Sequence, residues 1–176
     1  MIQYLAVSAL GTDEIGVAHH ISEIVAYHQC QTELTCMNKM ASEFAINLLV
    51  SGNRNNIIKL EAALNELANE ENLAIATKLA EDDAEENSTI PYIVQIITPY
   101  NASLLEQVTH FFAENEINIR EMTGCRYVAQ QTGLEMFNLQ LIIDLSMDAK
   151  IAQFREEFSS FCEQINIDAS LEPDKL

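Results

Sequence analysis

A short loop near the amino terminus, Gly11-Thr12-Asp13-Glu14-Ile15-Gly16, carries the residues best suited to binding a small anion. Glycine permits a tight backbone turn, and Thr12 or Asp13 can cap the helix that we expect to follow. The first N–H groups of a helix have no intrahelical partner, so they can donate to a carboxylate. The loop lacks the G-K-[ST] ending of a nucleotide P-loop. Capping without a ligand and a carboxylate site both remain open.

The cysteines and histidines do not follow a pattern typical of catalysis or metal binding. The four cysteines lack C-x-x-C spacing, and we expect free thiols in a reducing compartment: Cys30, Cys36, Cys125 and Cys162. His19 and His20 are adjacent, whereas metal-binding pairs on helices prefer i, i+4 spacing. A G-x-S-x-G nucleophile motif is also missing. The sequence therefore predicts no catalytic residue, no metal site, no cofactor and no enzymatic activity.

The charge of the chain restricts its partners. The formal net charge is −18, from 9 basic and 27 acidic residues, and the basic residues do not cluster. Neutralising nucleic-acid phosphates requires clustered Lys and Arg, so we expect no direct nucleic-acid binding. A basic protein surface fits this charge, although acidity can also serve solubility alone.

The amino-terminal segment does not resemble a targeting or membrane segment. Residues 1–10 have no basic n-region and lead into Gly11 as a first core strand would. No stretch is long and apolar enough for a membrane span. We expect a cytoplasmic protein that does not contact a membrane.

The chain contains an internal repeat. The stretch Ile2-Gln3-Tyr4-Leu5-Ala6-Val7 returns as Ile90-Pro91-Tyr92-Ile93-Val94-Gln95, which places Tyr92 88 residues after Tyr4. A period of this length is too long for a solenoid and matches one small domain.

Each half contains the same succession of periodic patterns. Period-two alternation predicts central strands around Phe44–Val50 and Phe137–Ile143. Apolar residues spaced by three and four predict two helices in each half. In the first half, the inner positions are Val17, Ile21, Ile24 and Val25 of one helix and Ile57, Leu60, Leu64 and Leu67 of the other. In the second half, they are Leu104, Val108, Phe111 and Phe112 of one helix and Ile151, Phe154, Phe158 and Phe161 of the other. Further strands are expected at residues 2–10, 30–39 and 72–79, and at 91–98, 117–128 and 165–171.

The resulting β-α-β-β-α-β order is ferredoxin-like, an α+β class with both helices on one face of a four-stranded antiparallel sheet. We expect a first domain at residues 1–80, an acidic linker at 81–89 and a second domain at 90–176. The first strands are apolar on both faces, so we expect the halves to pack together. Pairing within one chain and pairing across a homodimer both remain open.

The duplicated order, with a G-x-D-x-x-G turn after the first strand, resembles the ACT-domain family. The segments Ala9–Val17 and Glu43–Gly52 resemble two-ACT proteins of the glycine cleavage system transcriptional repressor family. The resemblance covers nearly the whole chain. It implies a regulator without catalytic activity, which restrains a LysR-type transcription activator by protein contact and is relieved by a small amino acid, with glycine expected.

The resemblance also implies ligand-binding residues. ACT domains hold amino acids with the first strand–helix loop of one domain and a residue opening the second strand of its neighbour. Carried over by position, the loop supplies Gly11, Thr12, Asp13 and Gly16, and the second-strand position falls on Gln31 in the first half and Asn118 in the second.

Two departures from the family pattern stand out. Glu14 and Ile15 replace a basic residue and a proline of the family loop, and the second loop, Thr98–Ser103, lacks the acid and the glycines. A ligand that uses the turn of one half and the asparagine of the other would sit between the halves. One alternative is an ACT-type adaptor that binds another small molecule or none. The other is an enzyme, which would be indicated if a single substitution at Asp13 or His28 abolished turnover.

Overall fold

The computed structural model describes residues 2–81 and 89–174, which form two compact units, one on each side of the gap. The first contains β1(Ile2–Thr12), α1(Val17–Tyr27), β2(Gln31–Met40), β3(Glu43–Asn53), α2(Arg54–Glu70) and β4(Ala74–Ala80). The second contains β5(Thr89–Pro99), α3(Leu104–Glu114), β6(Asn118–Val128), β7(Glu135–Ser146), α4(Ile151–Ile165) and β8(Ala169–Pro173). The predicted β-α-β-β-α-β order is confirmed in both halves.

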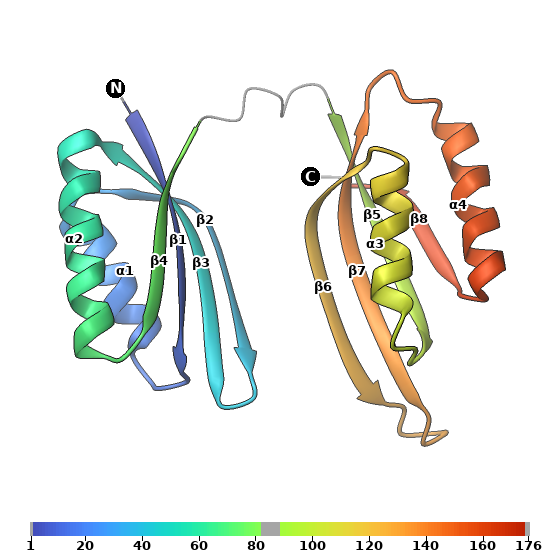
Figure 1. The fold of residues 1–176 in the computed structure, drawn as a ribbon, viewed down its shortest axis with the longest axis horizontal. Helices are drawn as coiled ribbons and strands as arrows, with labels where there is room; N and C mark the ends of the chain where they lie inside the picture. Colours follow the sequence, from blue (N-terminus) through green and yellow to red (C-terminus); the bar gives the residue numbers. More distant parts are fainter. Residues whose placement is uncertain (1, 82–88, 175–176) are drawn as a thin grey trace. The chain divides into compact units, whose positions relative to one another are not determined.

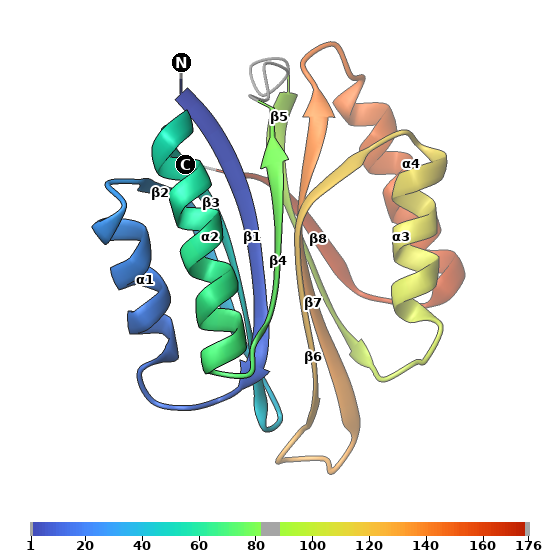
Figure 2. The ribbon, with the colours of Figure 1, turned by 60° about the vertical axis from the view of Figure 1, so that its left-hand side comes forward.

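Each unit is a four-stranded antiparallel sheet with both helices on one face (Figures 1 and 2). The strand orders, β2-β3-β1-β4 and β6-β7-β5-β8, are equivalent. The period-two alternation directs one side of each central strand under the helices, as in the buried series Phe44, Ile46, Leu48, Val50 and Leu139, Leu141, Ile143, Leu145. Each sheet therefore has a helix-covered face and an open face.

The two units have separate cores of different composition. The first is mainly aliphatic and includes one buried phenylalanine, Phe44. The second contains a connected phenylalanine cluster on α3 and α4, formed by Phe111, Phe112, Phe154, Phe158 and Phe161. Each unit thus carries the buried apolar surface that a small domain needs.

The repeat is real, but its apparent offset was wrong by one residue. Tyr4 lies on the open face opposite Ser51, whereas Tyr92 is buried on the helix-covered face opposite Ile143. A slip of one residue exchanges the faces of a strand, so Tyr92 corresponds structurally to Leu5. The ends of β1 and β5, Thr12 and Pro99, accordingly lie 87 positions apart.

The second closing strand was also misplaced. It begins at Ala169, because α4 continues to Ile165 and ends at Asn166 with φ 55° and ψ 55°. A left-handed residue of this kind terminates a helix. β8 could therefore not begin at residue 165.

Most of the expected linker, residues 82–88 of 81–89, lies outside the described residues. The domain boundaries therefore stay a prediction, although β4 ends at Ala80 and β5 begins at Thr89. Within the described part of the chain, every helix is too short or too polar to cross a bilayer.

The open face of the first sheet retains exposed apolar side chains. Leu10 is 43% exposed, and Leu34 on β2 is 52% exposed. The apolar character of β1 on both sides is thus seen in the structure. The packing that we inferred from it stays a prediction.

Candidate functional site

The first part of the candidate loop belongs to the sheet. Gly11 and Thr12 are the last residues of β1, and Gly11 pairs with Phe44. A Cβ atom on Gly11 would lie 2.3 Å from Cδ2 of the buried Leu73. Close packing explains this glycine, and the predicted turn at Gly11 is wrong.

The helix start is formed by Gly16, which is the N-cap of α1 with φ 109° and ψ −19°. L-residues rarely adopt this conformation, which explains the glycine. The N-cap makes no side-chain cap hydrogen bond, so the predicted capping by Thr12 or Asp13 is wrong. His20 N–H makes the first intrahelical bond, to the Gly16 carbonyl at 2.9 Å, so the preceding helical N–H groups have no partner within α1.

Asp13 connects the loop to the β2–β3 hairpin. Its N–H donates to the Ser42 carbonyl at 2.9 Å, and its Oδ2 accepts from Lys39 Nζ at 2.5 Å. The Glu14 N–H is also engaged, by the Thr12 carbonyl at 2.9 Å. An ammonium ligand at Asp13 would have to compete with Lys39.

The loop of the second unit makes the same connection with different chemistry. Tyr100, 87 positions after Asp13, donates its N–H to the Glu135 carbonyl at 2.8 Å. Arg126, 87 positions after Lys39, lies 4.4 Å from the centroid of the Tyr100 ring. Arg126 also pairs with Glu135, and this hydrogen bond raises the arginine pKa. The contact between loop and hairpin is therefore a feature that the two units share.

In the first unit, the second-strand candidate Gln31 lies far from this loop along the sheet. Gln31 opens β2 opposite Ser51, whereas Gly11 pairs with Phe44 on the same central strand. Seven residues of extended strand span about 23 Å. Within the first unit, Gln31 therefore cannot reach a ligand held by the loop.

Asn118 opens β6 and belongs to a polar cluster in the second unit. Its Nδ2 donates to Asp144 Oδ2 at 3.3 Å, and Arg120 Nη2 lies 2.8 Å from Asp144 Oδ1. A register shift between Ile119 and Glu121 lies beside this cluster, at Arg120. The first unit has the corresponding shift, where Ser51 Oγ donates to Glu33 Oε1 at 2.5 Å.

Sequence reasoning overlooked Asp144 and Arg120. The available signal was the interruption of period-two alternation at the start of β6.

The thiols agree with the expectation of free cysteines. All four are free, with Cys30 and Cys162 buried and Cys36 and Cys125 exposed. Burial raises the pKa of Cys30, and it raises that of Cys162 to about 11. Across residues 2–81 and 89–174, no three His, Cys, Asp or Glu side chains are grouped to hold a metal ion.

Comparison with known proteins relates the first unit to a named family. The ACT domain family model matches residues 3–78, which covers this unit from β1 into β4. The family resemblance inferred from the loop and the element order is thereby confirmed.

Relatives extend the similarity over both units. The chain is 24% identical over 168 residues to the glycine cleavage system transcriptional repressor of Escherichia coli (strain K12), covering 96% of this chain and 88% of that protein. The same values hold for the Shigella flexneri protein of that name. A crystal structure of an unknown protein from Galdieria sulphuraria, 24% identical, has the same fold with a TM-score of 0.81 and covers 99% of both chains.

Proposed function

We propose that this chain, whose first unit matches the ACT domain family and which resembles the glycine cleavage system transcriptional repressors over both units, regulates the transcription of glycine cleavage genes. It acts by contact with a LysR-type transcription activator and has no catalytic activity of its own. The observation that carries the proposal is similarity through both units to curated repressors, across 96% of this chain and 88% of theirs.

The charge supports contact with a protein in place of contact with DNA. The chain has a net charge of −18. Several of its cations are already engaged with carboxylates, as in the pairs Lys39–Asp13, Arg120–Asp144 and Arg126–Glu135. DNA binding requires cations directed at phosphates, whereas an acidic protein attracts a basic protein surface.

Glycine is the proposed regulatory ligand. Its carboxylate would accept from the N–H groups that open α1, where a Cβ on Gly16 would have no neighbour within 4 Å. Thr12 and Asp13 flank this position. Gln31 of the same unit lies too far along the sheet to share this ligand, so Asn118 is the proposed acceptor for the ammonium group. Gly11 supports the site through the packing of β1.

A second function is favoured by a specific contact in the loop. Asp13 is paired with Lys39, and Glu14 adds a negative charge near the helix start. Both features weaken binding of an amino acid there. The alternative is an ACT-type adaptor that binds the activator and takes a different small molecule or none.

Calorimetry and a pulldown test the two functions together. Millimolar glycine should release or absorb heat, raise the melting temperature and reduce retention of the activator. Retention of the activator without any response to glycine or other amino acids supports the adaptor. If the immobilised chain fails to retain the activator, regulation by contact is excluded.

A further inference from the structure

A hollow on the helical side of the second unit combines an apolar floor with an acidic rim. It is lined by Phe111 and Glu114 of α3 and by Gln153, Glu156, Glu157, Ser160, Phe161 and Gln164 of α4. The rings of Phe111 and Phe161 stack across the two helices, with centroids 4.4 Å apart. Both phenylalanines remain half-exposed. We call this feature the α3–α4 groove.

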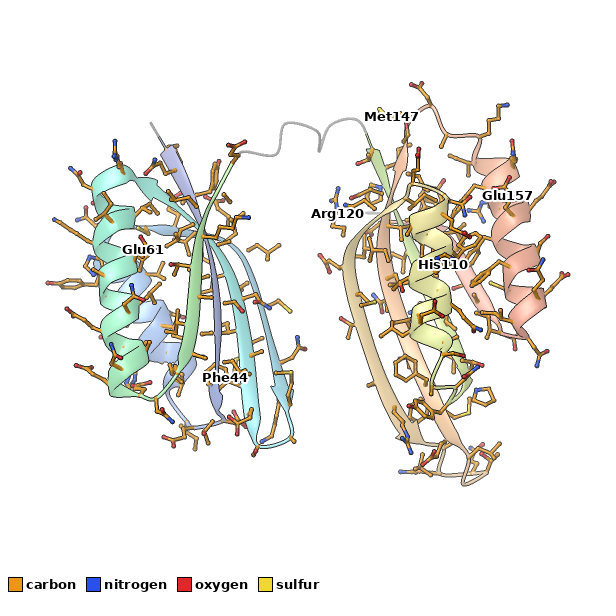
Figure 3. The ribbon with its side chains drawn as sticks, viewed as in Figure 1. Phe44, Glu61, His110, Arg120, Met147 and Glu157 are labelled. Atoms are coloured by element: carbon orange, nitrogen blue, oxygen red, sulfur yellow. The ribbon has the colours of Figure 1, made fainter. Side chains whose placement is uncertain are left out.

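The lining residues on α4 form a continuous stripe. Their spacing of three and four residues keeps them on one side of the helix, and the 11 steps from Gln153 to Gln164 extend about 16 Å. Glu157 of this stripe and His110 of α3 are labelled in Figure 3. The groove is therefore as long as about three turns of a docked helix.

The first unit has the same groove with different chemistry. Its lining includes Ile24 and Tyr27 of α1, with Lys59, Ala62, Ala63, Glu66, Leu67 and Glu70 of α2. Residues of α1 correspond to residues of α3 that lie 87 positions later, and residues of α2 correspond to residues of α4 that lie 94 positions later. With these offsets, the residues named above correspond one by one to those of the α3–α4 groove. Glu156 and Glu157 stand where the first unit has Ala62 and Ala63. Glu114 stands in place of Tyr27.

This correspondence separates what the fold requires from what it does not. Alanine occupies both rim positions in the first unit, so the helix packing does not demand glutamate there. The described lining of the α3–α4 groove contains three carboxylates and no Lys or Arg, whereas Lys59 lies in the other groove. The two half-exposed phenylalanines add apolar surface that Ile24 and Leu67 provide to a smaller extent.

We infer that the α3–α4 groove binds a basic amphipathic segment of a protein partner, most simply a short helix. An apolar side chain of the segment would contact Phe111 and Phe161, and flanking Lys or Arg would pair with Glu114, Glu156 and Glu157. Helix-in-groove recognition uses this combination of an apolar stripe and complementary charge. Identification of the partner as the transcription activator rests on the proposed function.

The rim carboxylates are accessible for such pairing. Glu114 is 67% exposed, with its Oε1 3.3 Å from His110 Nε2. Glu157 Oε1 accepts from the neighbouring Gln153 Nε2 at 2.8 Å. The amide of Gln153 is neutral, and the rim carries three carboxylates beside the one imidazole of His110, so an incoming cation meets an attractive field.

The first test measures anisotropy of a fluorescent helical peptide of about 15 residues, with Lys and Arg on one face and Leu and Phe on the other. The variant Glu156→Ala/Glu157→Ala copies the first unit. The control Glu66→Ala/Glu70→Ala removes the same number of carboxylates from the other groove. We expect about tenfold weaker binding in the first variant and less than about twofold in the control at 0.1 M salt. Equal losses, or no binding to the unchanged chain, would overturn the inference.

A floor variant tests the apolar contribution separately. Phe161→Leu installs the residue that the first unit has at this position, Leu67, and should weaken peptide binding about threefold without affecting the salt dependence. The melting temperature shows whether the variant is folded. Unchanged affinity in a folded variant excludes Phe161 from the contact and with it the proposed groove.

Retention of the LysR-type activator by the same variants separates this inference from the proposed function. Loss of retention with Glu156→Ala/Glu157→Ala but not with the control supports both. If the unchanged chain binds the peptide but not the activator, the proposed function fails and the groove stands. If both double variants retain the activator like the unchanged chain, the groove is not the contact surface and the proposed function stands.

Discussion

The two units place different side chains on one framework, and the differences show which residues the fold does not require. Both connect the first strand–helix loop to the following hairpin by an N–H to carbonyl bond, from Asp13 in one unit and Tyr100 in the other. Both then add a cation beneath the loop, Lys39 or Arg126. The loop residue that this cation contacts differs, the carboxylate of Asp13 in one unit and the ring of Tyr100 in the other. A contact present in both units belongs to the fold, whatever its chemistry.

The two cores also place different side chains at equivalent positions. Val25 of α1 and Phe112 of α3 lie at equivalent positions and are 3% and 0% exposed. The Phe112 ring contacts those of Phe111 and Phe158. The second helical layer is therefore filled by aromatic rings where the first uses aliphatic side chains.

The largest expected effect comes from truncating these two core positions. Phe112→Ala should lower the free energy of unfolding by about 3–5 kcal/mol, because it removes a fully buried ring from a cluster of rings. Val25→Ala should cost about 2 kcal/mol. Denaturant unfolding measures both, and hydrogen exchange shows which unit opens. Equal costs would mean that the aromatic cluster can collapse around the cavity.

The next largest effect is expected at the start of the first helix of each unit. Gly16→Ala should cost about 1–3 kcal/mol, because alanine at φ 109° is strained even though its Cβ has open space. The matched change Ser103→Ala should cost less than about 1 kcal/mol, because Ser103 has φ −91° and makes no side-chain cap bond. Thermal unfolding compares them. Equal costs would contradict a backbone role for Gly16.

Sequence patterns predicted the framework better than the loop. Alternation along Phe44–Val50 and the helical spacing of Val17, Ile21 and Val25 reflect burial on one face, which is a property of single elements. Element order and the covered faces follow from such patterns. Boundaries were less certain, as the late start of β8 shows.

The conformation of the loop depends on contacts with residues distant in sequence, which a local sequence pattern does not reveal. Glycine was expected to make a turn at residue 11, but the close approach of Leu73, distant in sequence, explains it. Asp13 was expected to cap α1, but Lys39 and Ser42 on the hairpin engage it. The matching of Tyr4 with Tyr92 relied on identity of residue type, whereas only the sheet register reports which face a side chain occupies.

A smaller effect is expected from the Asp13–Lys39 pair. Asp13→Ala should cost about 0.5 kcal/mol at low salt, because the pair is partly exposed and solvent screens it. Lys39→Ala should cost about the same, and the double variant little more than either. A helix cap would instead cost about 1 kcal/mol independently of Lys39. Urea unfolding at two salt concentrations distinguishes these outcomes.

The smallest effect on stability should come from modifying Cys36 and Cys125. Both thiols are exposed on strands, so alkylation at pH 8 should be fast and change the melting temperature little. Cys162 should react slowly, because burial raises its pKa to about 11 and leaves it protonated. Mass spectrometry of timed samples measures all the rates.

The pH dependence of Cys162 has a defined direction. An unfolded thiol ionises near about pH 8.5, whereas the folded Cys162 thiol has a pKa of about 11. The protonated thiol therefore supports folding fully below about pH 8.5, and this contribution is lost as the pH rises towards 11. The second unit should lose protection from hydrogen exchange over this pH range. The variant Cys162→Ala should lack the part of this loss that comes from ionisation of the thiol. Equal labelling rates for Cys162 and Cys125 in the folded chain would show instead that α4 opens readily, since only an opened helix exposes that thiol.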